Sequence, residues 1–275
     1  MLPSLLIVFR EAFEAGLIVG IVMAVTSGVA GRGRWVASGI AAGVFGACVV
    51  ALFTQSLSKL FGGSGQELFN AGILGFAVLM LGWHNVWMAR HGRELAAEMR
   101  AAGQAVVTGA KSLAALAVVV AVAVLREGSE VVLFLYGVAA ADGGAGVGML
   151  AGGAIGLVLG SLVCLLTYLG LITIPTRYLF GVTSTLIALL AAGMAAQAIA
   201  FLEQADILTA FDETVWDTSW ILSEASYPGR ALHTLIGYVD QPTAMQLIVY
   251  AATLAAILLL MRLFAVPPAR RPHAA

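Results

Sequence analysis

The sequence predicts an all-α polytopic membrane protein with seven transmembrane helices, and three observations support this class. Of the 275 residues, 61% are hydrophobic and only 11% are charged, whereas soluble domains carry roughly 25% charged residues. Apolar segments recur that have the roughly 20 residues a helix needs to cross a hydrocarbon core. One short charged motif occurs twice within them. The composition excludes a soluble or disordered chain, and the net charge of −1 leaves no basic surface for nucleic acid.

The first span is interrupted by charges, but it has neither the basic start nor the small-residue cleavage site of a signal peptide, so we interpret it as a retained helix. Glycines spaced four apart run from just before the fifth span into it, a pattern that favours close helix packing against a partner in this chain or another. The predicted spans are Ser4–Ala30, Trp35–Leu57, Leu68–Met88, Leu113–Val138, Gly146–Ile172, Tyr178–Leu202 and Ala244–Phe264. The glycines are Gly144, Gly148, Gly152, Gly156 and Gly160.

Basic residues gather in the connections on one side of the predicted bundle. That side holds Arg32, Arg34, Arg90, Arg93, Arg100, Lys111, Arg177, Arg262, Arg270 and Arg271. The other side holds only Lys59 and Arg230. Because cytoplasmic loops are enriched in Lys and Arg, this distribution places the N-terminus outside and the C-terminus in the cytoplasm.

We expect the chain to divide into a 3+3 inverted repeat plus one helix, within a single transmembrane domain. Inverted repeats with a site at their interface are a common plan of secondary transporters. The segments are a first three-helix repeat (1–91), a cytoplasmic linker helix (92–112), a second three-helix repeat (113–205), an outer acidic and aromatic loop (206–243), and a seventh helix with a basic tail (244–275).

The charged motif R-E-x-x-E occurs at Arg10–Glu14 in the first span and at Arg126–Glu130 in the fourth. A charged residue near the centre of a membrane costs roughly 2.5–3.5 kcal/mol on insertion scales. Three such residues recur in the same pattern in two helices, and chance explains this poorly.

Helical rotation places the three charges of each motif on one face. Arg10 can pair with Glu14, and Arg126 with Glu130, since i,i+4 residues are neighbours. If the two faces meet, four carboxylates and two guanidiniums leave a formal charge near −2, which calls for a cation such as a hard or borderline metal ion. Two alternatives stay open: ion pairs that only fix helix packing, and a relay that carries protons.

Acidic residues also gather at the predicted outer mouth, where they could collect cations on the way to the motifs. The competing interpretation of these residues is an ordinary loop at the membrane interface. For Glu203, the competing interpretation is a charged residue that ends a helix near the membrane surface. His84 is interpreted as an interfacial histidine more readily than as a ligand, because it sits between Trp83 and Trp87 at the end of the third span. The candidate access residues are Glu203, Asp212, Glu213, Asp217 and Glu224.

Two R-E-x-x-E helices in a seven-span chain resemble the oxidase-dependent iron transporter family, which includes fungal high-affinity iron permeases and bacterial EfeU-type permeases. The segments 215–220 (VWDTSW) and 229–238 (GRALHTLIGY) are similar to the bacterial branch. The resemblance covers essentially the whole chain. It implies iron uptake across a cytoplasmic or plasma membrane, by a transporter and not an enzyme. The Ala- and Gly-rich composition favours a bacterial source and hence the inner membrane.

The resemblance also implies site residues and partners. It makes Glu11, Glu14, Glu127 and Glu130 the iron ligands, with Arg10 and Arg126 as their charge partners. Iron is then a transported substrate, Fe²⁺ or Fe³⁺, and no cofactor is permanently bound. A periplasmic iron-binding or ferroxidase protein would be a partner, whereas the oligomeric state is not indicated.

From this assignment we expect iron to engage Glu11 and Glu14 first, in the outer half of the first span, and then Glu127 and Glu130. Two other functional classes remain as alternatives. One is a proton-conducting or proton-coupled carrier for another solute. The other is a membrane-embedded carboxylate metalloenzyme, although di-iron bundles use Glu-x-x-His motifs, which the predicted spans lack.

Overall fold

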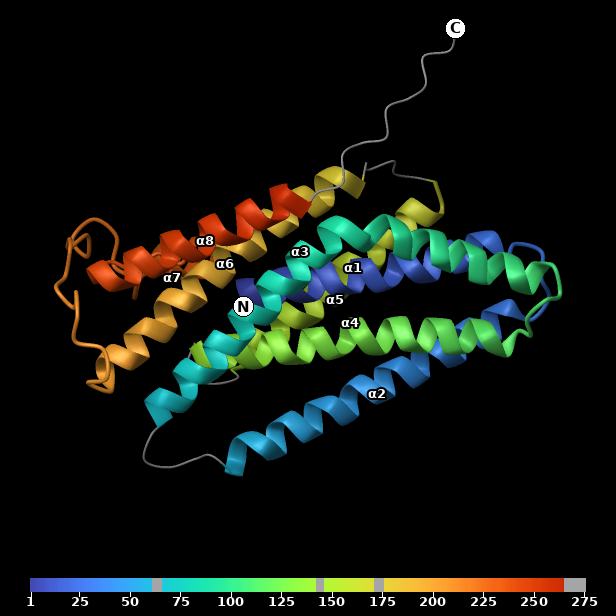
Figure 1. Cartoon of the computed structure of the whole chain (residues 1–275). Coiled ribbons are helices and arrows are strands. Elements are labelled where there is room, and N and C mark those ends of the chain that lie inside the picture. The colour runs from blue at the N-terminus through green and yellow to red at the C-terminus, as the bar shows by residue number, and fades with distance from the viewer. Residues whose placement is uncertain (61–65, 142–145, 171–175, 265–275) are drawn as a thin grey trace, which may run out of the picture.

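The structure is a computed structural model that describes residues 1–60, 66–141, 146–170 and 176–264. These residues form eight α-helices, and their one β-type pairing is an isolated bridge between Thr214 and Thr243. The predicted all-α class is therefore confirmed (Figure 1). The helices are α1 (Leu2–Val25), α2 (Arg32–Leu60), α3 (Gln66–Val107), α4 (Ala114–Ala141), α5 (Val147–Tyr168), α6 (Thr176–Gln204), α7 (Tyr227–Ile236) and α8 (Ala244–Phe264).

Each of the seven predicted spans coincides with one of the long helices, and the differences lie at the ends. Helix α1 stops at Val25 and not at Ala30, because the chain turns through Gly28 and Gly31, whose φ angles of 90° and 79° favour glycine. The last residues predicted for the fifth span, 171 and 172, lie outside the described residues.

A separate linker helix was predicted over 92–112, but most of this segment belongs to α3. The span and the linker form one helix of 42 residues that runs from Gln66 to Val107. No proline interrupts this stretch, and the chain turns only at Gly109, which has a φ of 76°. At 1.5 Å per residue, α3 has a contour length of about 63 Å, roughly twice the thickness of a hydrocarbon core. Figure 1 shows the helix changing direction part-way along its length.

Within the described residues, five helices are long and apolar enough to cross a membrane, namely α2, α3, α5, α6 and α8. The other two long helices, α1 and α4, are the ones interrupted by the R-E-x-x-E charges. Large apolar side chains cover the outside of the bundle. Phe45 on α2 is 72% exposed and Leu150 on α5 is 70% exposed. An apolar surface of this extent is suited to contact with lipid and not water.

Helix pairs are held together by glycines that admit a neighbouring backbone. Helix α5 packs along α1, where a Cβ on Gly156 would lie 2.4 Å from the carbonyl oxygen of Leu5. Helix α2 packs along α4, where a Cβ on Gly43 would lie 2.8 Å from the carbonyl oxygen of Ala121. The packing interpretation of the glycine stripe is thus confirmed for Gly152, Gly156 and Gly160, and the partner is α1 of the same chain. Gly144 lies outside the described residues.

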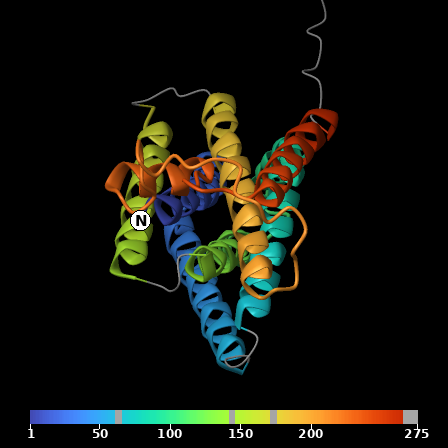
Figure 2. The same ribbon diagram turned by 90° about the vertical axis from the view of Figure 1, so that its left-hand side faces the viewer.

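The segment between α6 and α8 is folded and contains α7, a helix that was not expected from the sequence. Ser226 caps α7 by accepting a hydrogen bond from the Gly229 amide at 3.1 Å, and Gly237 ends the helix with a φ of 70°. The Tyr238 hydroxyl bonds Thr218 at 2.7 Å. Figure 2 shows this segment lying across the end of the bundle where the N-terminus of α1 lies.

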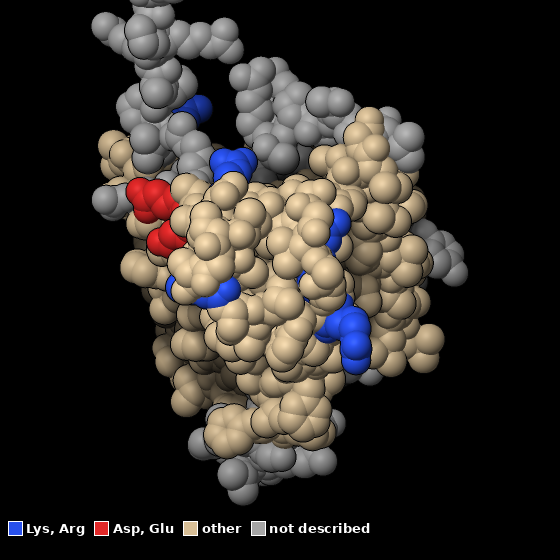
Figure 3. Space-filling model, turned by 90° about the vertical axis from the view of Figure 1, so that its right-hand side faces the viewer, with Lys and Arg blue, Asp and Glu red and all other residues tan. Residues whose placement is uncertain are grey.

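The opposite end of the bundle is basic. Figure 3 shows Lys and Arg side chains distributed over it. Basic residues on the connections and helix ends at this end of the bundle include Arg32, Arg34, Arg100 and Lys111. A small apolar cluster around Val22, which includes Leu116 and Val120 from α4, packs the helices together behind this surface.

Candidate metal site

The first motif lies on the buried face of α1. Ile7, Glu11, Glu14 and Ile18 recur at helical spacing, and all four are at most 5% exposed. This spacing keeps one stripe of α1 inside the bundle. Two of its members are carboxylates with no access to solvent water, so the local structure must supply groups that compensate their charge.

Arg10 pairs with both glutamates of its own motif. Its Nη1 donates a hydrogen bond to Oε1 of Glu11 at 3.2 Å, and its Nε lies 2.9 Å from Oε1 of Glu14. The predicted pairing of Arg10 with Glu14 is confirmed. The guanidinium is 1% exposed, so water screens these contacts little. One buried cation therefore faces two buried carboxylates on α1.

The second motif shows the same pairing in a more open setting. Arg126 Nε donates a hydrogen bond to Oε1 of Glu130 at 3.2 Å, as predicted, and lies 3.9 Å from Oε1 of Glu127. Glu127 is 2% exposed, but the Arg126 side chain is 34% exposed and its guanidinium lies over the ring of Trp87. The two motifs thus match in sequence and differ in burial.

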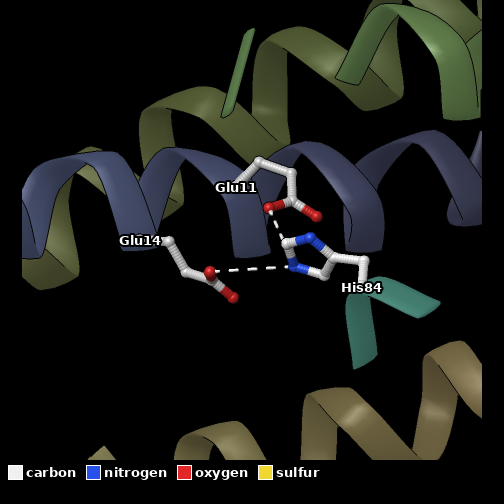
Figure 4. A group of neighbouring side chains, drawn as sticks. All are labelled: Glu11, Glu14 and His84. Carbon is white, nitrogen blue, oxygen red and sulfur yellow. Dashed lines mark ion pairs between the residues drawn. The ribbon is translucent and has the colours of Figure 1, made fainter. Parts of the chain in front are cut away.

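The faces of the two motifs meet, and His84 of α3 lies between them. His84 Nε2 is 4.0 Å from Oε2 of Glu11 and 3.9 Å from Oε2 of Glu14. On the other side of the ring, Nδ1 contacts Oε2 of Glu130. Figure 4 shows the two α1 carboxylates and the imidazole directed toward one another.

Two neighbours hold the imidazole of His84 in place. Phe134 packs edge-on against the ring at 6.2 Å between centroids. The adjacent Asn85 donates a hydrogen bond to the carbonyl oxygen of Ser184 at 2.8 Å, which ties this turn of α3 to α6. The position of His84 is therefore set by three helices and not by α3 alone.

Several polar atoms in this cluster are buried without a hydrogen-bond partner. They are Nε and Nη2 of Arg10, Oε2 of Glu11, both carboxylate oxygens of Glu14, Nε2 of His84, Oδ1 of Asn85, Oε2 of Glu127 and Oε2 of Glu130. Oε1 of Glu14 still forms an ion pair with Arg10 Nε at 2.9 Å, and Oε2 of Glu130 contacts Nδ1 of His84. Buried polar groups are normally satisfied, and leaving one unsatisfied costs about 1–3 kcal/mol, more for a charged group. Glu11 Oε2, Glu14 Oε2, Glu127 Oε2 and His84 Nε2 come from three helices and carry free electron pairs, which is what a bound cation requires.

Two overlapping groups have the geometry to hold a metal ion. One consists of Glu11, Glu14 and His84, and the other of Glu11, Glu127 and Glu130; in each, one ligand atom per residue lies within 4.8 Å of the others. Within the described part of the chain these are the clusters of three or more Asp, Glu, His or Cys side chains that could do so. The donors are carboxylate oxygens and an imidazole nitrogen, which suit divalent metal ions of hard to borderline character.

This arrangement changes two of the expectations from the sequence. The motif glutamates do not form two stations at different depths, because Glu11 belongs to both groups and the carboxylates make one cluster. His84 is not an interfacial residue, since it is 3% exposed and contacts glutamates of both motifs. Its place in the site was missed because a single histidine among aromatic residues carries no spacing signal.

Apolar side chains close the cluster on both sides along the helix axes. On α4, Leu116 and Val120 lie before the glutamates and belong to the cluster near the basic end. Phe134 and Val138 follow the glutamates and belong to a larger cluster with Ile7 of α1. All these side chains are at most 3% exposed. An ion in the site would therefore be separated from water at both ends of the bundle.

The acidic residues predicted to line the access path do not join the cluster. Glu203 accepts hydrogen bonds from Thr243 Oγ1 at 2.8 Å and from Gln246 Nε2 at 3.0 Å, which ties the end of α6 to the start of α8. Asp212 and Glu213 are exposed on the loop that follows. Glu203 thus has a structural role here, while the other two remain open to solvent.

Asp217 and Glu224 take part in the structure of the same loop. The side-chain and backbone hydrogen bonds of Ser219 hold the pKa of Asp217 below its ordinary value of 3.8. Burial raises the pKa of Glu224 above 4.5, an effect that His233, 3.1 Å away, partly offsets. Both carboxylates already have partners in the loop, which leaves fewer oxygens for a passing ion.

Comparison with known proteins points to one family. The chain matches the Iron permease FTR1 family over residues 1–270. Ferrous iron permease EfeU of Yersinia pestis is 31% identical over 272 residues, which cover 98% of this chain and 94% of that protein. The proteins of the same name from Shigella sonnei and Escherichia coli O157:H7 are each 32% identical over 273 residues, 98% of this chain and 96% of theirs. No solved structure matches the chain.

Proposed function

The chain belongs to the FTR1 iron permease family, and we propose that it takes up iron across the cytoplasmic membrane of a bacterium through the glutamates of its two R-E-x-x-E motifs. It is a transporter and not an enzyme. The observation that carries the proposal is the meeting of both motifs in one buried cluster, in which several carboxylate oxygens and Nε2 of His84 lack a hydrogen-bond partner. Glu11, Glu14, Glu127 and Glu130 would replace the water ligands of the ion.

We propose the seven-span topology for the same chain, with the N-terminus outside and the C-terminus in the cytoplasm. Helices α1 and α4 join the five apolar spans because their charges face the interior of the bundle and not the lipid. The basic end of the bundle becomes cytoplasmic. The 3+3 inverted repeat is supported by the packing, since α1 with α5 and α4 with α2 are equivalent pairs under exchange of the two halves.

The transport step requires the apolar clusters on either side of the site to open in turn. The close glycine contacts pack α1 against α5 and α4 against α2, and each pair would move as a unit. Movement of one pair against the other would expose the glutamates first to the outer side and then to the cytoplasm, as in alternating access. Asp212 and Glu213 would attract the cation at the outer mouth. Any oxidation of iron would belong to a periplasmic partner protein.

The test is uptake of radiolabelled iron into proteoliposomes that contain the purified protein, with ferrous and ferric-chelate conditions in parallel. Glu127→Gln removes one carboxylate charge from the buried cluster and should abolish uptake. The matched control is Glu98→Gln, the same substitution at an exposed position of α3. Equal uptake by Glu127→Gln and the wild type would refute the site. Proton flux in the same vesicles without iron uptake would favour a proton pathway instead.

A further inference from the structure

The imidazole of His84 lies where a ligand of the ion would lie, although the R-E-x-x-E motifs do not include it. We propose that His84 Nε2 is a direct metal ligand, and that this nitrogen makes the site selective for a borderline divalent transition-metal ion over Mg²⁺ and Ca²⁺. The inference rests on the proposed transport function and specifies its substrate class. His84 is 3% exposed, and its Nε2 has no hydrogen-bond partner.

The distances fit shared coordination better than hydrogen bonding. Nε2 is 4.0 Å from the nearest oxygen of Glu11 and 3.9 Å from that of Glu14, which is too long for a hydrogen bond. Two ligands bound at about 2.0–2.2 Å to one ion are separated by roughly 3–4 Å, depending on the bond angle. An ion between these atoms would therefore need only small side-chain adjustments, and it would satisfy all three groups.

Glu130 holds the ring in the orientation that coordination requires. Its Oε2 contacts Nδ1 of His84, while Oε1 accepts the hydrogen bond of Arg126. A carboxylate beside one ring nitrogen keeps the N–H on that nitrogen and leaves the lone pair of the other nitrogen for a metal. Nε2 is the nitrogen that faces Glu11 and Glu14. Glu130 thus positions His84 in addition to its place among the proposed carboxylate ligands.

The nitrogen ligand has a consequence for selectivity. Carboxylates alone serve Mg²⁺ and Ca²⁺ well, whereas imidazole favours iron, zinc and related ions. A site of glutamates plus one histidine therefore discriminates against the two divalent cations that are hard and abundant. With His84 replaced, the remaining oxygen ligands would keep a general affinity for divalent cations and lose this preference.

The experiment compares the wild type, His84→Gln and His91→Gln. His91 is a matched control because it lies two turns further along α3, stacked on Trp87 at 4.9 Å and outside the cluster. Mn²⁺ bound to the purified protein is the probe, and electron spin-echo modulation detects a coordinated ¹⁴N. We expect the modulation in the wild type and in His91→Gln, and its loss in His84→Gln.

Uptake provides the second measurement. Loss of even an outer partner of a metal ligand costs about 10–100-fold in affinity, so His84→Gln should raise the half-saturating Fe²⁺ concentration at least about tenfold. Excess Mg²⁺ or Ca²⁺ should inhibit the remaining uptake more strongly than in the wild type. Where His84→Gln does not give a monodisperse protein, His84→Ala replaces it.

The outcomes separate this inference from the proposed function. Persistence of the ¹⁴N modulation in His84→Gln, or its absence from the wild type, overturns the role of His84 while leaving iron transport standing. Conversely, a wild type that shows the modulation but takes up no iron retains the His84 ligand and overturns the transport assignment. Unchanged affinity and unchanged inhibition by Mg²⁺ in His84→Gln would overturn the selectivity argument.

Discussion

The guanidinium carbon of Arg126 lies 4.1 Å from the centroid of the Trp87 ring, so the arginine of the second motif rests on an aromatic face. Arg10, its counterpart in the first motif, is 1% exposed and is held by two glutamates of its own helix. The two arginines should therefore respond differently to substitution, although their motifs are the same.

Arg10→Gln should destabilise the protein strongly. The change leaves Glu11 and Glu14 buried without their cation, and breaking a buried ion pair in this way costs about 3–5 kcal/mol. Arg126→Lys keeps the charge but loses the planar stack on Trp87, which is worth about 0.5–1 kcal/mol at a partly exposed site. Thermal unfolding in detergent, followed by size-exclusion chromatography, measures both. Equal melting temperatures for the two variants would contradict this difference.

Gly156→Ala should impair both stability and uptake by moving α1. A Cβ at this position would lie 2.4 Å from the carbonyl oxygen of Leu5 and 2.9 Å from the amide nitrogen of Phe9. Both are backbone atoms of α1, so the clash can be relieved only if the helix itself shifts. Overpacking of this kind costs about 1–3 kcal/mol, and the shift carries Glu11 with it.

Gly153→Ala is the matched control on the same helix, because its nearest neighbour would be a Val8 methyl carbon at an ordinary 3.7 Å. Melting temperature and iron uptake of the two variants are compared. The packing argument fails if Gly153→Ala is as damaging as Gly156→Ala.

Much of the site could be predicted from the sequence, because it depends on local helix geometry. The spacing of Arg10 and Glu14 fixes their pairing within one turn, and the same spacing puts the charges of each motif on one face. Whether the two faces meet does not follow from this spacing. His84 could not be predicted in this way. Its depth depends on how α3 packs against α1 and α4, and the continuation of α3 to Val107 moves His84 away from the helix end.

The contacts of the acidic residues in the outer loop could not be predicted from the sequence either. Its acidic composition predicted a cation-collecting surface, but hydrogen bonds between distant segments decide which carboxylates are engaged. Glu203 is bound by Gln246, and Asp217 is bound by Gln241 at 3.0 Å. Such pairings join positions far apart in the sequence, and no local pattern reports them.

The outer loop should loosen in acid as Asp217 becomes protonated. Its pKa lies below 3.8 because the folded loop favours the carboxylate. The stabilising contribution is therefore fully present above the unfolded value and is lost as the pH falls through the lowered pKa. Hydrogen exchange over residues 215–221, corrected for intrinsic rates, should accelerate below about pH 4. Asp217→Ala should show faster exchange already at neutral pH, and an unchanged rate there would contradict the role of this carboxylate.

Neutralising Asp212 and Glu213 together should slow the capture of iron without abolishing its transport. Both side chains are exposed, and a negative mouth raises the local concentration of cations at low ionic strength. The double variant Asp212→Asn/Glu213→Gln should therefore show reduced initial uptake at 10 mM salt, where the Debye length is about 30 Å, and near-normal uptake at 0.15 M, where it is about 8 Å. A salt-independent loss would instead indicate that one of the two carboxylates binds the ion directly, whereas normal uptake at both salt concentrations would remove them from the access path.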